Sequence, residues 1–176
     1  MFYPEVYEIA KRQPKPKESG VIIDLGEANE KQRQFYLSTA LYTAYGGAKG
    51  GGKTHAVRTK AIGGALEYPG IKILILRRAY GDLQQGIIEP IVKIVEGNAL
   101  GTYDASKHIL YFINGSTIRF GNLDSATYET TYQGQEYDWI FMDEATQFTW
   151  RQFQYIRGCL RGVNDIPKRF YLTCNP

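Results

Sequence analysis

Residues 45–54 read YGGAKGGGKT, a stretch in which five glycines surround two lysines and lead to a threonine. Gly47, Gly52, Lys53 and Thr54 have the spacing G-x-x-x-x-G-K-[ST]. At this spacing, backbone N–H groups surround phosphate oxygens, the lysine reaches the β- and γ-phosphates, and the threonine hydroxyl ligates Mg²⁺. The pattern predicts a site for ATP with Mg²⁺, and the alternative is a glycine-rich surface loop with incidental lysines. The residues predicted to contact the nucleotide are Gly47, Ala48, Lys49, Gly50, Gly51, Gly52, Lys53 and Thr54.

A pair of acids supplies the second half of the predicted chemistry. The apolar run Trp139–Met142 leads directly into Asp143 and Glu144. We expect Asp143 to hold Mg²⁺ through its water shell and Glu144 to polarise the attacking water. A solvated acidic turn is the alternative, and the phosphate-binding loop upstream favours the catalytic interpretation. The chain lacks the Asp-x-x-Gly and Asn-Lys-x-Asp patterns of a GTPase, so the acids indicate ATP hydrolysis.

The last residues, like the acid pair, are polar side chains that follow an apolar strand. The apolar residues Tyr171 and Leu172 lead into Thr173, Cys174, Asn175 and Pro176. Small polar groups at the end of a strand beside the acids are suited to sensing the γ-phosphate or its water. An ordinary strand end with a turn is the alternative.

Hydrophobic periodicity predicts the elements that position these residues. Ala40–Tyr45 predicts a buried strand before the loop, and Thr54–Glu67 has apolar residues at helical spacing after it. A helix is expected from Asn29 to about Thr39, with Phe35 and Leu37 facing inward. Further expected elements are a strand at Ile71–Leu76, a helix at Tyr80–Glu96 interrupted by Pro90, a hairpin of Ile109–Ile113 and Thr117–Phe120, a strand at Trp139–Met142, a helix near Trp150–Leu160 and a strand at Arg169–Cys174. This alternation predicts an α/β fold with a mainly parallel sheet and helices on both faces.

Composition suits one globular domain, because 43% of the 176 residues are hydrophobic. No apolar run reaches membrane-spanning length, and two cysteines, Cys159 and Cys174, indicate neither a disulfide framework nor a zinc cluster. A cytosolic setting follows. The net charge of +3 permits nucleic-acid binding without establishing it. Residues 1–28 are predicted to form an extended arm, basic and broken by prolines at 11–17, and residues 29–176 the ATPase domain.

Three motifs give the chain a resemblance to a known family. Gly46–Thr54, Asp143-Glu144-Ala145 and Thr173-Cys174-Asn175-Pro176 resemble the ATPase domain of bacteriophage terminase large subunits, the motors that package DNA into procapsids. The resemblance extends from about Asn29 and includes Lys49, Arg77-Arg78 at a strand end, and Gly134 before the acids. It implies a P-loop NTPase fold of the RecA-like class, a three-layer α/β/α sandwich that binds ATP and Mg²⁺.

The resemblance also implies roles for single residues. Gln32 matches an adenine-reading glutamine, and a surface glutamine on a helix is the alternative. Lys49 matches a loop position where these motors often have arginine, and there it would neutralise phosphate charge. Thr173 and Asn175 match a motif that couples hydrolysis to domain motion. At Gln133 many members instead carry an arginine that reaches the nucleotide of a neighbouring subunit, so the chain departs from the family there.

The partners that the resemblance implies are double-stranded DNA, the portal and procapsid, the terminase small subunit, and further copies of the chain in a ring. A monomer is expected in isolation, in the host cell cytoplasm, with no membrane partner. The family's metal-dependent nuclease domain would follow Pro176 and is expected to be absent from this chain. Candidate DNA contacts are Arg77, Arg78, Lys107 and Arg119, together with Lys11, Lys15 and Lys17 on the arm.

Two other functions stay open at this point. DEAD-type helicases also combine a phosphate-binding loop with Asp-Glu-Ala, although Thr-Cys-Asn-Pro replaces their Ser-Ala-Thr. A nucleotide-binding assembly subunit with little turnover is the second alternative. Glu144 argues against it, because a structural binder does not need a water-activating acid.

Overall fold

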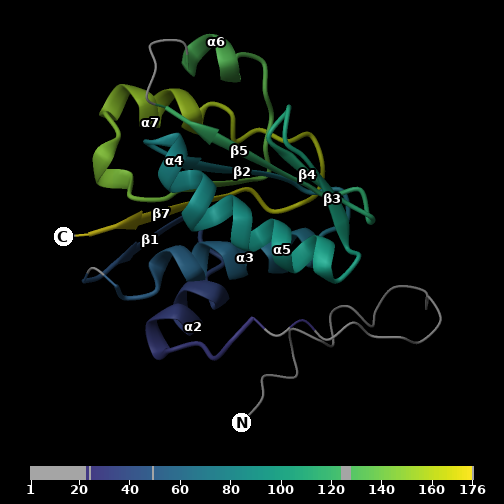
Figure 1. The fold of residues 1–176 in the computed structure, drawn as a ribbon. Coiled ribbons are helices and arrows are strands. Elements are labelled where there is room, and N and C mark those ends of the chain that lie inside the picture. Colours follow the sequence, from purple (N-terminus) through teal and green to yellow (C-terminus); the bar gives the residue numbers. More distant parts are fainter. Residues whose placement is uncertain (1–22, 24, 49, 124–127, 176) are drawn as a thin grey trace.

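One mixed sheet organises the chain, and helices cover both of its faces (Figure 1). The computed structural model describes residue 23 and residues 25–48, 50–123 and 128–175. Within these residues, seven strands form a sheet in the order β1-β7-β6-β2-β5-β4-β3. Lys49 and the basic stretch of the predicted arm lie outside the described residues.

Five neighbouring strands of the sheet run parallel, and two further strands extend it as an antiparallel edge. The parallel part confirms the predicted α/β architecture. The parallel strands are β1 (Tyr42–Gly46), β7 (Arg169–Cys174), β6 (Trp139–Met142), β2 (Lys72–Arg77) and β5 (Thr117–Asn122), and the antiparallel ones are β4 (Ile109–Phe112) and β3 (Gly101–Asp104).

The helices form the outer two layers of the sandwich. Figure 1 shows α3 and α5 below the sheet and α6 and α7 above it. The helical elements are α2 (Glu30–Leu37), α3 (Lys53–Glu67), α4 (Tyr80–Leu83), the π-helix η2 (Gln84–Ile88), α5 (Glu89–Gly97), α6 (Tyr128–Tyr132), the 3₁₀-helix η3 (Ala145–Gln147) and α7 (Trp150–Arg157). No helix of the described residues is long and apolar enough to cross a bilayer.

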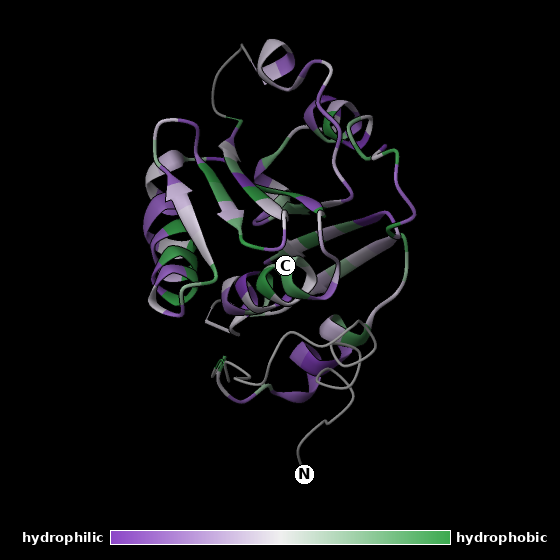
Figure 2. Ribbon diagram, turned by 90° about the vertical axis from the view of Figure 1, so that its right-hand side faces the viewer, coloured by the Kyte–Doolittle hydropathy of each residue, from purple (hydrophilic) through white to green (hydrophobic). Residues whose placement is uncertain are grey.

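Two hydrophobic clusters, one on each face, hold the layers together. Ile73 and Ile75 of β2 point into the cluster shared with α3 and α5, and Leu74 and Leu76 point into the cluster shared with α6 and α7. This alternation follows from the two-residue period of a strand whose faces are both covered. Figure 2 shows hydrophobic residues gathered on the strands, with hydrophilic residues alternating along the helices.

The parallel arrangement brings the predicted motifs to one edge. In a parallel sheet the carboxyl ends of neighbouring strands meet, and loops that follow them form a common crevice. Gly46 at the end of β1 pairs with Cys174 of β7, and Met142 at the end of β6 pairs with Leu172 of β7. The phosphate-binding loop, the acid pair and the polar chain end therefore lie side by side.

Some expectations about local structure were wrong. Leu37 was expected to face inward with Phe35, but it is 58% exposed because α2 ends there and the chain turns away. The helix expected from Tyr80 to Glu96 is divided into α4, the π-helix η2 and α5. Pro90 lies in the first turn of α5, where a missing N–H is tolerated. The short elements β3 and α6 were not predicted.

Candidate functional site

The phosphate-binding loop connects β1 to α3 through backbone that only glycine adopts readily. Gly50 and Gly52 have φ of 83° and 71°, in the left-handed region. Helix α3 begins at Lys53 after Gly52, and no side chain caps its first turn. The N–H groups of that turn carry the positive end of the helix dipole, which favours an anion at this position.

Lys53 is folded back over the loop. Its Nζ donates to the carbonyl oxygens of Gly47 and Ala48, each at 2.7 Å, and the residue is only 9% exposed. A buried ammonium needs acceptors on every side, because burial without them is strongly unfavourable. The two carbonyls hold its charge beside the uncapped start of α3.

Asp143 is the centre of the site and is almost fully buried. Thr54 Oγ1 donates to its Oδ2 at 3.1 Å, and Thr173 Oγ1 donates to its Oδ1 in a short hydrogen bond. The Arg77 Nε lies 3.0 Å from the same Oδ2 as Thr54. That Nε makes no hydrogen bond to a described residue, so the contact is a pairing of charges. Three elements, α3, β7 and β2, thus converge on one carboxylate.

Glu144 is fixed in a strained conformation directly after Asp143. Its φ of 58° and ψ of 50° are left-handed, which costs a non-glycine residue about 1 kcal/mol or more. Its Oε1 accepts from Arg77 Nη2 at 3.0 Å, and its Oε2 accepts from Gln147 Nε2 at 2.7 Å. Its N–H donates to Thr173 Oγ1 at 3.1 Å. The carboxylate is therefore held at both oxygens while its backbone is tied to β7.

Arg77 is a side chain of this site that the sequence did not assign to it. It was a candidate DNA contact, but its side chain is only 12% exposed and pairs with both acids. Its Nη1 also donates to the carbonyl of Asp82 at 2.9 Å. In the sequence, only the position of Arg77 at the end of a predicted strand pointed toward this site. The sequence did not show that β2 pairs with β6, and this pairing puts Arg77 beside the acids.

A cavity of about 320 Å³ joins these groups. Gly50–Thr54 line one side of it, and Asp143, Glu144 and Asn175 line the other. The Asn175 Oδ1 is buried without a hydrogen-bond partner among the described residues, so it is available to a ligand or water. Arg58, one turn along α3 from Thr54, also lines the cavity. Burial lowers the pKa of Arg58, and the nearby charge of Asp143 opposes that shift.

Gln32 lies beside the loop and braces it. Its Nε2 donates to the carbonyl of Gly52 at 3.1 Å, and its Oε1 accepts from the N–H of Asn29 at 2.9 Å. Asn29 returns a bond to the N–H of Gln32, which completes a capping box at the start of α2. Through these hydrogen bonds the Gln32 amide links α2 to the loop, and the residue is only 5% exposed. The adenine contact stays a prediction.

Most of the predicted site residues are brought together. Thr173 and Asn175 lie at the end of β7 next to the acids, as their place in the chain suggested. Lys49 was predicted to contact phosphate, and it lies outside the described residues. Gln133 is exposed in the turn after α6. Arg119, another candidate DNA contact, packs over the Tyr132 ring, and Lys107 pairs with Asp104.

Comparisons with known proteins agree with this architecture. The chain is similar to the ATPase domain of a Thermus phage large terminase, with a TM-score of 0.70, 17% identity and coverage of 99% of this chain and 69% of that one. It is similar to the large terminase of bacteriophage HK97, with a TM-score of 0.70, 13% identity and coverage of 85% of this chain and 33% of that one. At such identities the likeness establishes the fold, that of a P-loop ATPase domain.

A third similar structure contains nucleotide. It is the large terminase of a thermophilic bacteriophage in complex with ADP, with a TM-score of 0.67, 14% identity and coverage of 84% of this chain and 38% of that one. The same terminase has been solved with ATP-γ-S, and that structure matches with a TM-score of 0.63 and 13% identity, covering 84% of this chain and 38% of that one. The chain thus spans well under half the length of the two longer terminases that it resembles.

The family of the chain is assigned from its sequence. No curated protein matched the chain. The family described as phage terminase large subunit matches residues 39–176, which is well over half of the chain and includes the loop, the acid pair and the polar end of β7. The chain therefore belongs to the phage terminase large subunit family.

Proposed function

We propose that the chain hydrolyses ATP to ADP and phosphate, and that this hydrolysis drives double-stranded DNA into a procapsid. The observation that carries the proposal is the hydrogen bond of 3.1 Å from Thr54 Oγ1 to Asp143 Oδ2, which joins the two motifs across 89 residues. Family membership supports the packaging role, and the related terminase with bound ADP and ATP-γ-S supports the nucleotide.

A magnesium ion fits the oxygens at this contact. Mg²⁺ prefers hard oxygen ligands, and ATPase sites hold it through one or two carboxylates together with substrate phosphates. The Thr54 hydroxyl and the Asp143 carboxylate offer that donor set. The described part of the chain contains no cluster of three or more His, Cys, Asp or Glu side chains suited to a metal. When bound, the ion neutralises charge on the β- and γ-phosphates.

Lys53 is the proposed partner of those phosphates. Its ammonium has three donors, and two of them bind loop carbonyls at 2.7 Å. Exchange of these bonds for phosphate oxygens keeps a buried charge satisfied while it adds a charge-assisted contact to the substrate. The glycines at 50, 51 and 52 leave room for the phosphates beside the first turn of α3. Lys49 is proposed to add charge from within the loop.

Glu144 is the proposed base for the attacking water. Both of its carboxylate oxygens accept bonds, one from Arg77 and one from Gln147. Each oxygen keeps a second lone pair, so Glu144 can accept a proton from water while the two bonds hold its carboxylate in place. Arg77 thereby positions the proposed base, and it also neutralises Asp143.

Thr173 and Asn175 are the proposed coupling residues. The Thr173 hydroxyl donates to Asp143 and accepts from the Glu144 backbone N–H. Both acids are therefore hydrogen-bonded to the end of β7. A change at either acid therefore reaches β7, and the Asn175 Oδ1 in the cavity gives a second contact with the nucleotide side.

The wider assignments follow from the family. Residues 29–176 are proposed as the ATPase domain, with residues 1–28 as an arm before it. The proposed partners are double-stranded DNA, the portal and procapsid, the terminase small subunit, and copies of this chain in a ring that assembles for packaging from a free monomer. The proposed setting is the host cell cytoplasm.

The test measures ATP binding and steady-state turnover, with and without DNA and procapsids. Lys53→Ala should lose measurable binding or turnover. Glu144→Gln should still bind ATP and turn it over about a hundredfold more slowly, because glutamine keeps the shape but cannot accept the proton. Glu136→Gln, at a residue whose pair with Arg161 is long and exposed, is the matched control and should behave as the parent chain does.

Three results would count against the assignment. A loss of less than about tenfold in Glu144→Gln would remove Glu144 as the base, since it falls well short of a general-base contribution. Unchanged binding and turnover in Lys53→Ala would remove the nucleotide site. Turnover that depends on single-stranded nucleic acid and ignores procapsids would favour a helicase.

A further inference from the structure

The helical stretch that follows β2 widens beside Arg77. The chain is helical from Tyr80 to Gly97, but between α4 and α5 it forms the π-helix η2. There the N–H of Glu89 donates to the carbonyl of Gln84, five residues back, instead of to a carbonyl four residues back. Turns of this kind are rare and occur frequently at functional sites. The position of η2 therefore needs a physical cause.

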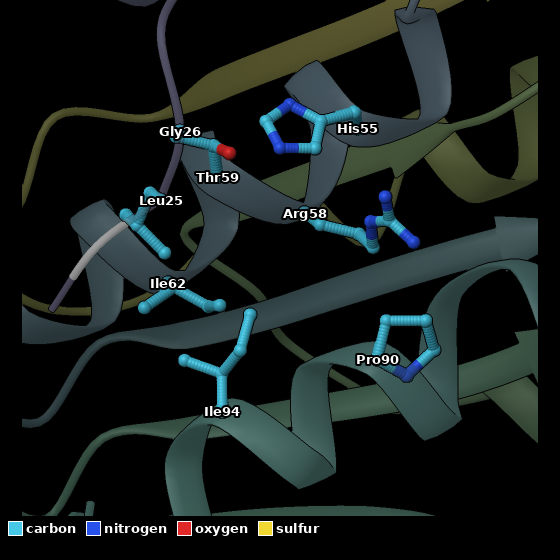
Figure 3. Close-up of a pocket in the computed structure, with 8 residues that line it drawn as sticks. All are labelled: Leu25, Gly26, His55, Arg58, Thr59, Ile62, Pro90 and Ile94. Atoms are coloured by element: carbon cyan, nitrogen blue, oxygen red, sulfur yellow. The ribbon is translucent and has the colours of Figure 1, made fainter.

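Pro90, directly after η2, supplies the local cause. In an α-helix the carbonyl of Gly86 would accept from the N–H of residue 90, and proline has none. The proline ring would also collide with that carbonyl, and a wider turn relieves the collision. The freed carbonyl of Gly86 accepts instead from Arg58 Nη1 at 3.1 Å. Figure 3 shows Arg58 of α3 and Pro90 of α5, which line the same pocket of about 290 Å³. The proline thus frees a carbonyl that ties η2 to α3.

Gly86 also packs against the guanidinium of Arg77. A Cβ at position 86 would lie 2.9 Å from Arg77 Nη1, which is closer than a carbon side chain can remain. The same Nη1 donates to the carbonyl of Asp82 at 2.9 Å, one turn earlier in the helical stretch. Backbone groups of Asp82 and Gly86 therefore lie against one side of the guanidinium.

The other side of the Arg77 guanidinium faces the two acids. Its Nε lies 3.0 Å from Asp143 Oδ2, and its Nη2 lies 3.0 Å from Glu144 Oε1. A guanidinium is planar and rigid, so the position of Nη1 determines the positions of Nε and Nη2. A side chain at position 86 would therefore displace the group that holds the Glu144 carboxylate.

We infer that Gly86 is a positioning residue for ATP hydrolysis, because the absence of a Cβ there lets Arg77 hold Glu144 in place. The inference rests on the proposed ATPase function. Gly86 is not one of the described residues that line the phosphate cavity, so it acts through Arg77. Its φ lies outside the left-handed region, so the backbone conformation by itself does not require glycine. The close approach of Arg77 is the reason for glycine at this position.

Steady-state ATP turnover by two alanine variants of the same helical stretch tests this inference. Gly86→Ala should lower kcat about tenfold, because small displacements of positioning groups are costly in catalysis. The KM for ATP should change less than about twofold, because the added methyl would meet Thr54 at an ordinary 3.9 Å. Gly81→Ala, whose Cβ would meet nothing within 4 Å, is the matched control and should keep the kcat of the parent chain. Alanine favours a helix, so neither variant should unfold.

A double-mutant cycle shows whether the effect passes through Arg77. Arg77→Lys keeps the positive charge but removes Nη1, the atom that a Cβ at position 86 would meet. In the Arg77→Lys background, Gly86→Ala should therefore change kcat less than about twofold. An equal loss of kcat in both backgrounds would overturn the inference. So would a Gly86→Ala variant with the kcat of the parent chain.

The NMR resonance of the Arg77 Nε–H group gives a readout that does not depend on turnover. It is identified as the arginine side-chain resonance that Arg77→Lys removes. Gly86→Ala should shift this resonance, and Gly81→Ala should leave it in place. An unshifted resonance in Gly86→Ala would contradict the contact between Gly86 and Arg77. Failure of the ATPase assignment looks different, because a parent chain without turnover would still show the shift in Gly86→Ala.

Discussion

Arg77 lies 3.0 Å from a carboxylate oxygen of Asp143 and 3.0 Å from one of Glu144, so a single guanidinium links the two acids at the end of β6. Its neighbour Arg78 points elsewhere and donates to the carbonyl of Gln147 at 2.8 Å in an exposed contact. Two adjacent arginines therefore have different environments, and this difference can be measured.

Replacement of Arg77 by alanine should destabilise the chain strongly. The buried Asp143 would keep its charge without the partner that neutralises it, and such losses cost about 3 kcal/mol or more. ATP turnover should fall as well, because Glu144 loses the group that positions it. Arg78→Ala is the matched control, with an expected change within about 0.5 kcal/mol. Urea unfolding and steady-state turnover measure the two effects, and equal stability of the variants would refute this account.

Thr173→Val should separate ATP binding from hydrolysis. Valine keeps the shape of threonine but removes the hydroxyl that bonds Asp143 and the Glu144 backbone. The buried groups left without a partner cost about 1–3 kcal/mol of stability. ATP affinity should stay within a few fold while turnover falls, as calorimetry and phosphate release would show. Thr117→Val on β5, far from the acids, should leave turnover unchanged. A Thr173→Val variant with full turnover would exclude a link between β7 and the acids.

Lys60 should give the chain a stability that rises with pH. Burial is the larger cause and the charge of Arg169 the smaller one, and together they lower the pKa of Lys60 from 10.5 to about 8. Between these two values the unfolded chain binds more protons than the folded one, so raising the pH through this window stabilises the fold. Lys60→Met removes the titration and should be the more stable protein at pH 7.5.

The gap between Lys60→Met and the parent chain should then close by about 2 kcal/mol between pH 7.5 and pH 10. Comparison with the variant cancels the tyrosines that titrate above this range. Urea unfolding at four or five pH values measures the gap. A gap that does not depend on pH would show that Lys60 is charged throughout.

Two neighbouring glycines of α3 should respond oppositely to alanine. A Cβ on Gly64 would lie 2.2 Å from the Trp139 ring, whereas a Cβ on Gly63 would meet nothing within 4 Å. Gly64→Ala must displace α3 from β6 and should cost about 1–3 kcal/mol. Gly63→Ala should stabilise the chain by about 0.5–1 kcal/mol, because alanine favours a helix. Thermal unfolding of both variants tests this, and a stable Gly64→Ala would show that α3 can move away from the sheet.

The sequence by itself predicted the chemistry proposed for the site. The spacing of Gly47, Gly52, Lys53 and Thr54 is local, because a loop of about eight residues contains all the backbone and side-chain groups that a phosphate needs. The acids after Trp139–Met142 are local in the same way, and so is the alternation of strands and helices that predicts the α/β fold. Patterns of this kind are contained in a few turns of chain, and sequence analysis can read them.

Only the tertiary structure decided what surrounds that chemistry. Arg77 reaches Glu144 because β2 pairs with β6 in the sheet, a contact across 67 residues that no periodicity encodes. Gln32 braces Gly52 across 20 residues, and Leu37 is exposed because of where α2 ends. Strand order and the ends of helices depend on the packing of the whole domain, since the free energy of each long-range contact depends on all the others. The partners of the proposed catalytic groups are therefore a property of the fold.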